Sequence, residues 1–143
     1  MLTKYAASYA ATFVLMVLMD LVWLGVVAKP FYQQGIGHLM AEQPRLGVAA
    51  LFYLMYAVAI VVFAVAPNEG RAGLGRVAMM GALFGFFAYA TYDLSNLATL
   101  KNWPVSLALM DMAWGSAVSA ASAVAGKWML DRFTARRSGD AYR

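Results

Sequence analysis

The sequence predicts an all-α fold, a four-helix transmembrane bundle whose N and C termini both lie in the cytoplasm. Composition is the first reason: of 143 residues, 63% are hydrophobic and only 13% are charged, which is too apolar for a soluble domain. The second reason is that four apolar stretches are each long enough to cross a hydrocarbon core of about 30 Å. These stretches leave no room for a second domain, so residues 1–143 are expected to form a single integral membrane domain.

The first two helices are expected at about residues 5–28 and 47–66. The first carries Asp20 as its only charge and is longer than the apolar region of a signal peptide, which is about 7–15 residues; a retained helix is therefore predicted. The second carries no charge. Residues 29–45 between them contain proline and glycine but also large apolar side chains. We expect this segment to lie at the membrane interface or to fold over the mouth of the bundle, with a short helix.

The third and fourth helices are expected at about residues 77–100 and 105–130, and each carries one aspartate. The sequence Pro-Asn-Glu-Gly at residues 67–70 is typical of a turn, so the second and third helices should form a tight hairpin. Residues 132–143 are rich in arginine and are predicted to form a basic cytoplasmic tail.

The placement of lysine and arginine is the third reason and sets the orientation. Three basic residues fall on the side that holds residues 29–45, and eight fall on the side of the N-terminus: Lys4, Arg71, Arg76, Lys127, Arg132, Arg136, Arg137 and Arg143. The positive-inside rule therefore places both termini in the cytoplasm. This rule also explains the net charge of +4. The expected partner is the lipid bilayer, and no nucleic acid is predicted.

Three aspartates define a candidate site. Asp20, Asp93 and Asp111 each lie seven to nine residues from the same predicted membrane boundary, which places them roughly 10–14 Å inside it. A charge at this depth costs several kcal/mol, so such residues usually face the bundle interior and mark a site. Aromatic and amide side chains on the same helix faces complete the candidate ligand-binding set: Asp20, Trp23, Tyr53, Tyr89, Tyr92, Asp93, Asn96, Asp111 and Trp114.

The pattern Asp-x-x-Trp occurs twice, at Asp20 with Trp23 and at Asp111 with Trp114. The indole N–H is a donor that a buried carboxylate needs. Because the first and fourth helices run antiparallel, we expect Trp114 to bond to Asp20 and Trp23 to bond to Asp111.

The segment at residues 89–104, together with the two Asp-x-x-Trp patterns and Gly25, resembles a family of small bacterial predicted membrane proteins, domain of unknown function 2177. The resemblance extends over the whole chain. It implies a four-helix, multi-pass protein of the bacterial inner (plasma) membrane. In a bacterium, the orientation predicted from the basic residues makes the acid layer face the periplasm. It implies no activity.

Missing residues exclude several classes of site. The chain has no cysteine, which excludes thiol–disulfide chemistry, thiolate metal sites and iron–sulfur clusters. Its one histidine, His38, cannot form a bis-histidine haem site. A nucleotide-binding P-loop is absent, and no helix carries an acid cluster that would hold a magnesium diphosphate. No metal and no cofactor are predicted, and catalytic residues are not assigned.

Three interpretations of the acid layer stay open. The acids can pair structurally with Lys29, Arg45, Lys101 and the aromatic side chains. They can form a pocket that binds or translocates a cation, a proton or a polar small molecule. They can also serve an enzyme that transfers a proton to a lipid or isoprenoid-like substrate. Apolar cytoplasmic halves favour a one-sided pocket. Gly81 and Gly85 suit close helix contact, either in a homodimer or within the bundle.

Overall fold

The computed structural model describes residues 2–70 and 73–140, with side chains described as far as Ala135. Every regular element in this part of the chain is helical. In chain order these elements are α1 (Leu2–Val22), η1 (Trp23–Val27), α2 (Lys29–Ile36), η2 (Gly37–Leu39), α3 (Leu46–Ile60), η3 (Val61–Val65), η4 (Ala66–Asn68), α4 (Leu74–Thr99) and α5 (Val105–Asp140).

Four helical spans are long and apolar enough to cross a membrane, which confirms the predicted all-α, four-helix fold, while the orientation of the termini stays a prediction. They are Leu2–Val27, Leu46–Asn68, Leu74–Thr99 and Val105–Ala135. The ends of the first three lie within three residues of the predicted ends. The fourth differs, because α5 continues to Asp140 where the sequence placed a tail from residue 132. Residues 141–143 of that predicted tail lie outside the described residues.

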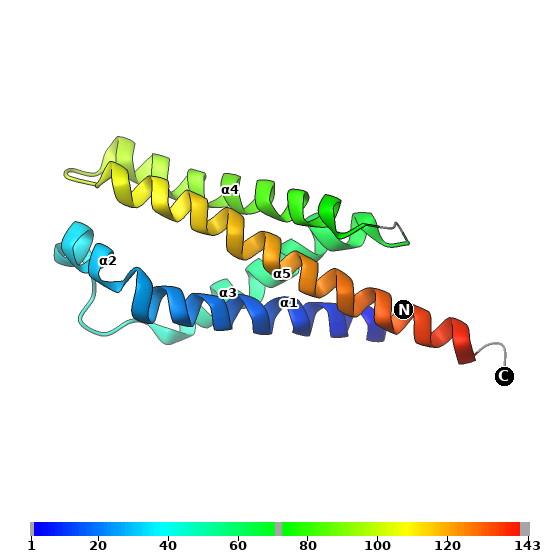
Figure 1. Cartoon of the computed structure of the whole chain (residues 1–143). Coiled ribbons are helices and arrows are strands. Elements are labelled where there is room, and N and C mark those ends of the chain that lie inside the picture. The colour runs from blue at the N-terminus through cyan, green and yellow to red at the C-terminus, as the bar shows by residue number, and fades with distance from the viewer. Residues whose placement is uncertain (1, 71–72, 141–143) are drawn as a thin grey trace.

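Helix α5 lies at the centre of the bundle and packs against α4 on one side and α1 on the other (Figure 1). The start of α1, the end of α5 and the η4 turn lie at one end of the bundle, and α2 lies at the other end beside the turn between α4 and α5 (Figure 1). Many apolar side chains face outward, such as Leu18, Leu51, Phe87 and Leu109. An apolar outer surface is what contact with lipid requires.

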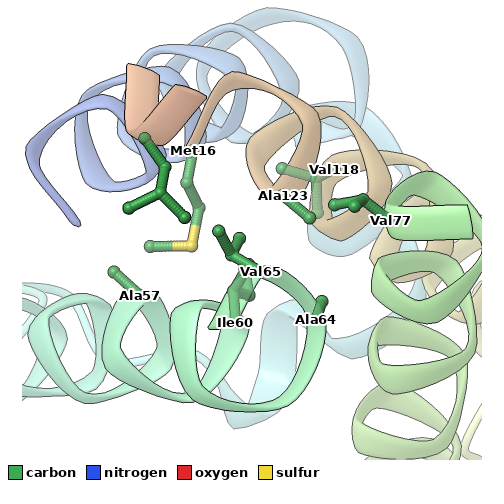
Figure 2. Packing of buried hydrophobic residues seen from close by; sticks show 9 residues of the cluster. Met16, Ala57, Ile60, Ala64, Val65, Val77, Val118 and Ala123 are labelled. Atoms are coloured by element: carbon green, nitrogen blue, oxygen red, sulfur yellow. The ribbon is translucent and has the colours of Figure 1, made fainter. Parts of the chain in front are cut away.

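Buried apolar side chains fill the half of the bundle that is nearer the chain ends. This core comprises Met16, Ala57, Ile60, Ala64, Val65, Val77, Val118, Ala123 and Leu130. Figure 2 shows Met16, Ile60 and Val65 meeting between the helices. Its alanine members, Ala57, Ala64 and Ala123, are small enough to let the helices approach closely.

The closest helix contact is between α4 and α5. A Cβ atom built on Gly85 would lie 2.0 Å from the Gly115 carbonyl oxygen, and one built on Gly81 would lie 2.8 Å from the Ser119 carbonyl oxygen. Both glycines of the G-x-x-x-G pattern are therefore used within the chain, where they let two backbones touch. A homodimer stays a prediction, but these glycines do not support it.

The segment between the first two spans forms the short helix α2, which packs on the start of α5. Ile36 is buried in a cluster with Trp103, Leu107 and Ala108. A Cβ on Gly35 would lie 2.9 Å from the Pro104 side chain, so the two segments are in close contact. This close packing holds α2 against the end of the bundle, as the apolar side chains of residues 29–45 predicted.

Candidate functional site

A cavity of about 590 Å³ lies at the α2 end of the bundle. Each of the four spans contributes to its wall, and α2 adds one side chain. Eight of the lining residues are aromatic and two are acidic. The lining residues are Asp20, Trp23, Leu24, Tyr32, Ala49, Phe52, Tyr53, Tyr56, Ala88, Tyr89, Tyr92, Asp111 and Trp114.

Asp20 is buried on the inner face of α1 and is only 4% exposed. Its Oδ1 atom accepts a hydrogen bond of 2.8 Å from the indole Nε1 of Trp114 on α5. The hydroxyl of Tyr53 on α3 lies close enough to interact with the same carboxylate. Asp20 therefore links three helices through neutral donors, and the predicted Trp114–Asp20 bond is confirmed.

Asp111 lies in the second turn of α5 and is 2% exposed. The Tyr32 hydroxyl of α2 donates a hydrogen bond to it. Burial raises the pKa of Tyr32, and the bond to Asp111 raises it further, so this phenol stays neutral and remains a donor. The sequence assigned this role to Trp23, which was wrong.

Trp23 instead stacks on Trp114. The two ring centroids are 4.2 Å apart and the planes differ by 3°, while the Trp23 Nε1 atom has no hydrogen-bond partner. Because α2 folds against the start of α5, the Tyr32 side chain reaches Asp111. The Trp23 ring faces the Trp114 ring instead. The stacked pair forms a flat aromatic section of the cavity wall.

None of the three aspartates forms an ion pair within residues 2–70 and 73–135. The ion pairs in this range join Lys4 to Glu69 and Lys127 to Asp131. The basic residues proposed as structural partners, Lys29, Arg45 and Lys101, are exposed. The structural interpretation that depends on these cations therefore has no contact to support it.

Asp93 and Asn96 belong to the predicted set but do not line the cavity. Asp93 is completely buried, and neither carboxylate oxygen has a hydrogen-bond partner. The indole of Trp103 and the carboxylate of Asp111 are close enough to act on it. Its neighbour Tyr92 lines the cavity because successive residues project about 100° apart on a helix.

The structure brings the other seven predicted residues together around the cavity: Asp20, Trp23, Tyr53, Tyr89, Tyr92, Asp111 and Trp114. Sequence reasoning missed Tyr32, Phe52 and Tyr56. A signal existed for Tyr56, which follows Tyr53 by three residues on one helix face. It existed also for Tyr32, which lies in the apolar segment expected at the bundle mouth. Phe52 had no such signal, since nothing distinguishes it from a lipid-facing phenylalanine.

The cavity ends toward the chain termini at Tyr56. Its hydroxyl is 2.9 Å from the Ser119 Oγ atom, and its ring lies against Phe84 with centroids 5.3 Å apart. The apolar core described above continues from this point. No group of three acidic or histidine side chains that would suit a metal ion occurs among the described residues.

A family model described as a predicted membrane protein (DUF2177) matches residues 5–128 of the chain. The matched region includes every residue that lines the cavity. No curated protein and no solved structure matches the chain.

Proposed function

The chain belongs to the DUF2177 family of predicted membrane proteins, and we propose that its cavity binds a small organic cation with an apolar body. The observation that supports this proposal is the hydrogen bonding of Asp20 and Asp111. Both carboxylates line the cavity, and their hydrogen-bond donors are neutral indole and phenol groups. Neutral donors leave a carboxylate its negative charge. A cationic ligand would balance this negative charge, and the attraction between the two charges is strongest where water is excluded.

The aromatic wall supports the same ligand class. Aromatic faces attract cations, and each such contact contributes about 2 kcal/mol when the groups are desolvated. The side chains of Trp23, Trp114, Tyr53 and Tyr89 surround the acidic pair. The cavity volume of about 590 Å³ lies within the range of small-molecule sites.

Binding fits the geometry better than translocation of the ligand. A transporter needs a second route from the site to the opposite face. Here Met16, Ile60, Val65 and Val118 are almost completely buried and fill the bundle beyond the cavity. This packing favours a pocket that opens toward the α2 end.

We propose that the protein lies in the bacterial inner membrane, and charge placement supports an orientation with both termini in the cytoplasm. By the sequence count, eight basic residues belong to the side that holds Lys4 and Lys127 and three belong to the other side, and the cavity lies at the α2 end of the bundle. In this orientation the pocket faces the periplasm.

Titration of the purified full chain with benzyltrimethylammonium tests the proposal, with neopentylbenzene as a neutral probe of the same shape. Tryptophan fluorescence reports binding, because Trp23 and Trp114 line the cavity. We expect the cation to bind and the neutral probe to bind at least about tenfold more weakly, since only the cation gains the carboxylate interaction.

Asp20→Asn and Asp111→Asn should each weaken binding of the cation about tenfold or more. Glu42→Gln is the matched control, because it removes one carboxylate from an exposed loop residue and should leave affinity unchanged. Equal binding of the two probes, or full affinity in both aspartate variants, would show that the acid layer is only structural.

A further inference from the structure

Three buried hydroxyl groups differ from most of the hydroxyls that the structure describes on α4 and α5. Hydroxyls of α4 and α5 commonly donate to the carbonyl four residues earlier, and those that do are Thr91, Ser95, Thr99, Ser116 and Thr134. Ser8, Thr12 and Ser122 are 0% exposed, yet their oxygens have no hydrogen-bond partner. A buried hydroxyl without a partner costs about 1–3 kcal/mol, so this set needs an explanation.

The three hydroxyls gather at one contact between α1 and α5. A Cβ atom built on Gly126 would lie 2.2 Å from the Thr12 Oγ1 atom and 3.2 Å from the Ser8 Oγ atom. Both hydroxyls of α1 therefore point at the Gly126 backbone. Ser122 precedes Gly126 by one helical turn on α5, so it lies on the same face.

Toward the cavity, the next hydroxyl on α5 is Ser119, which is 2.9 Å from the Tyr56 hydroxyl. Tyr56 lines the cavity and is near enough to Asp20 to interact with it electrostatically. Polar groups thus continue from the Asp20 carboxylate to Ser119, and Ser122 follows one turn later.

Toward the chain termini, Lys127 follows Gly126 directly. Its side chain is 2% exposed and pairs with Asp131. Lys127 acts electrostatically on Glu69, which accepts hydrogen bonds from Lys4 and Tyr5. Titratable groups are therefore present at both ends of the hydroxyl set.

We propose that Tyr56, Ser119, Ser122, Thr12 and Ser8 form a proton path from the cavity to the Glu69–Lys127 end of the bundle. Each hydroxyl accepts a proton on a lone pair and releases its own proton to the next oxygen, with water molecules bridging the longer steps. The Asp20 carboxylate takes up one proton from the cavity side and passes it to the path, and one proton leaves at the far end, so only O–H bonds form and break. The core side chains leave no passage for a larger ligand. The path does not depend on which ligand the cavity takes.

Proteoliposomes that contain the full chain test this path. A potassium gradient with valinomycin sets the membrane potential, and entrapped pyranine reports the internal pH. We expect proton uptake faster than in protein-free vesicles. Thr12→Val and Ser122→Ala should reduce uptake to the protein-free level, while Ser122→Thr, which keeps a hydroxyl, should retain it.

Thr91→Val and Ser116→Ala are matched controls, since they remove hydroxyls that bond to their own helix, and they should conduct like the wild type. Thr12→Val should bind benzyltrimethylammonium normally and unfold no more easily, because it removes an oxygen without a partner. Wild-type uptake no faster than in empty vesicles, full uptake in both path variants, or equal loss in the controls would overturn the path. None of these results would bear on cation binding.

Discussion

Gly85→Ala perturbs the helix contact on which the shape of the cavity depends. The added Cβ would lie 2.0 Å from the Gly115 carbonyl oxygen and 2.5 Å from the Ser119 Oγ atom. Ordinary contact begins at 3.4 Å, so α4 and α5 must separate by about 1.4 Å at this level. The first obstacle is backbone, which cannot rotate away as a side chain would.

Overpacking of this kind costs about 3 kcal/mol when the neighbour cannot yield. The better helix propensity of alanine returns about 1 kcal/mol, so the free energy of unfolding should fall by about 2 kcal/mol in total. Cation affinity should also fall, because Gly115 packs directly against Tyr89, and Tyr89 lines the cavity.

Unfolding by sodium dodecyl sulfate, followed by circular dichroism in mixed micelles, measures the stability. Gly75→Ala is the matched control on the same helix, since a Cβ there meets nothing within 4 Å; it should be neutral or stabilising. If Gly85→Ala unfolds at the same detergent fraction as Gly75→Ala, the close contact between α4 and α5 is refuted.

Three further predictions concern other parts of the chain. A cysteine at Gln34 should react with an impermeant reagent in whole cells while one at Pro67 should not; both positions are exposed, and labelling at Pro67 alone would show that the orientation is the reverse of the predicted one. Lys4 holds the pKa of Glu69 below its usual value, so this contact stabilises the fold above a pH of about 4.3 and is lost as pH falls through the lowered pKa. Thermal unfolding of Glu69→Gln should therefore change less between neutral and acidic pH than that of the wild type, and an equal change would contradict the contact. Asp93→Asn should keep affinity for benzyltrimethylammonium and raise the free energy of unfolding by about 1 kcal/mol, because an amide costs less to bury than a carboxylate without a partner; loss of binding at unchanged stability would place Asp93 in the pocket.

The spans and the common level of Asp20 and Asp111 were predictable because both depend on quantities that are local in the sequence. Hydropathy sets the spans, and the rise per residue places Asp20 and Asp111 at one level. The Trp114–Asp20 bond could be predicted because the two residues lie at that level on helices that run antiparallel, the first and the fourth.

Other features depend on how each helix is rotated about its axis, which spacing alone leaves open. Asp93 and Tyr92 are adjacent in sequence, but only Tyr92 meets the cavity. Tyr32 replaced Trp23 at Asp111 because α2 follows a path that no periodicity specifies. The sequence prediction ended the fourth helix at about residue 130, whereas α5 continues to Asp140. Beyond residue 130 the helix is polar, so hydropathy does not indicate where the helix ends.

The stacked indoles of Trp23 and Trp114 give this protein an optical reporter of its own. Two identical chromophores that are parallel at 4.2 Å couple their excited states, and the coupling decays steeply with separation and tilt. The near-ultraviolet circular dichroism of the unlabelled chain thus contains a signature of this one contact. Because one ring belongs to η1 and the other to α5, a change in that signature would register relative movement of two helices across the cavity without any introduced probe.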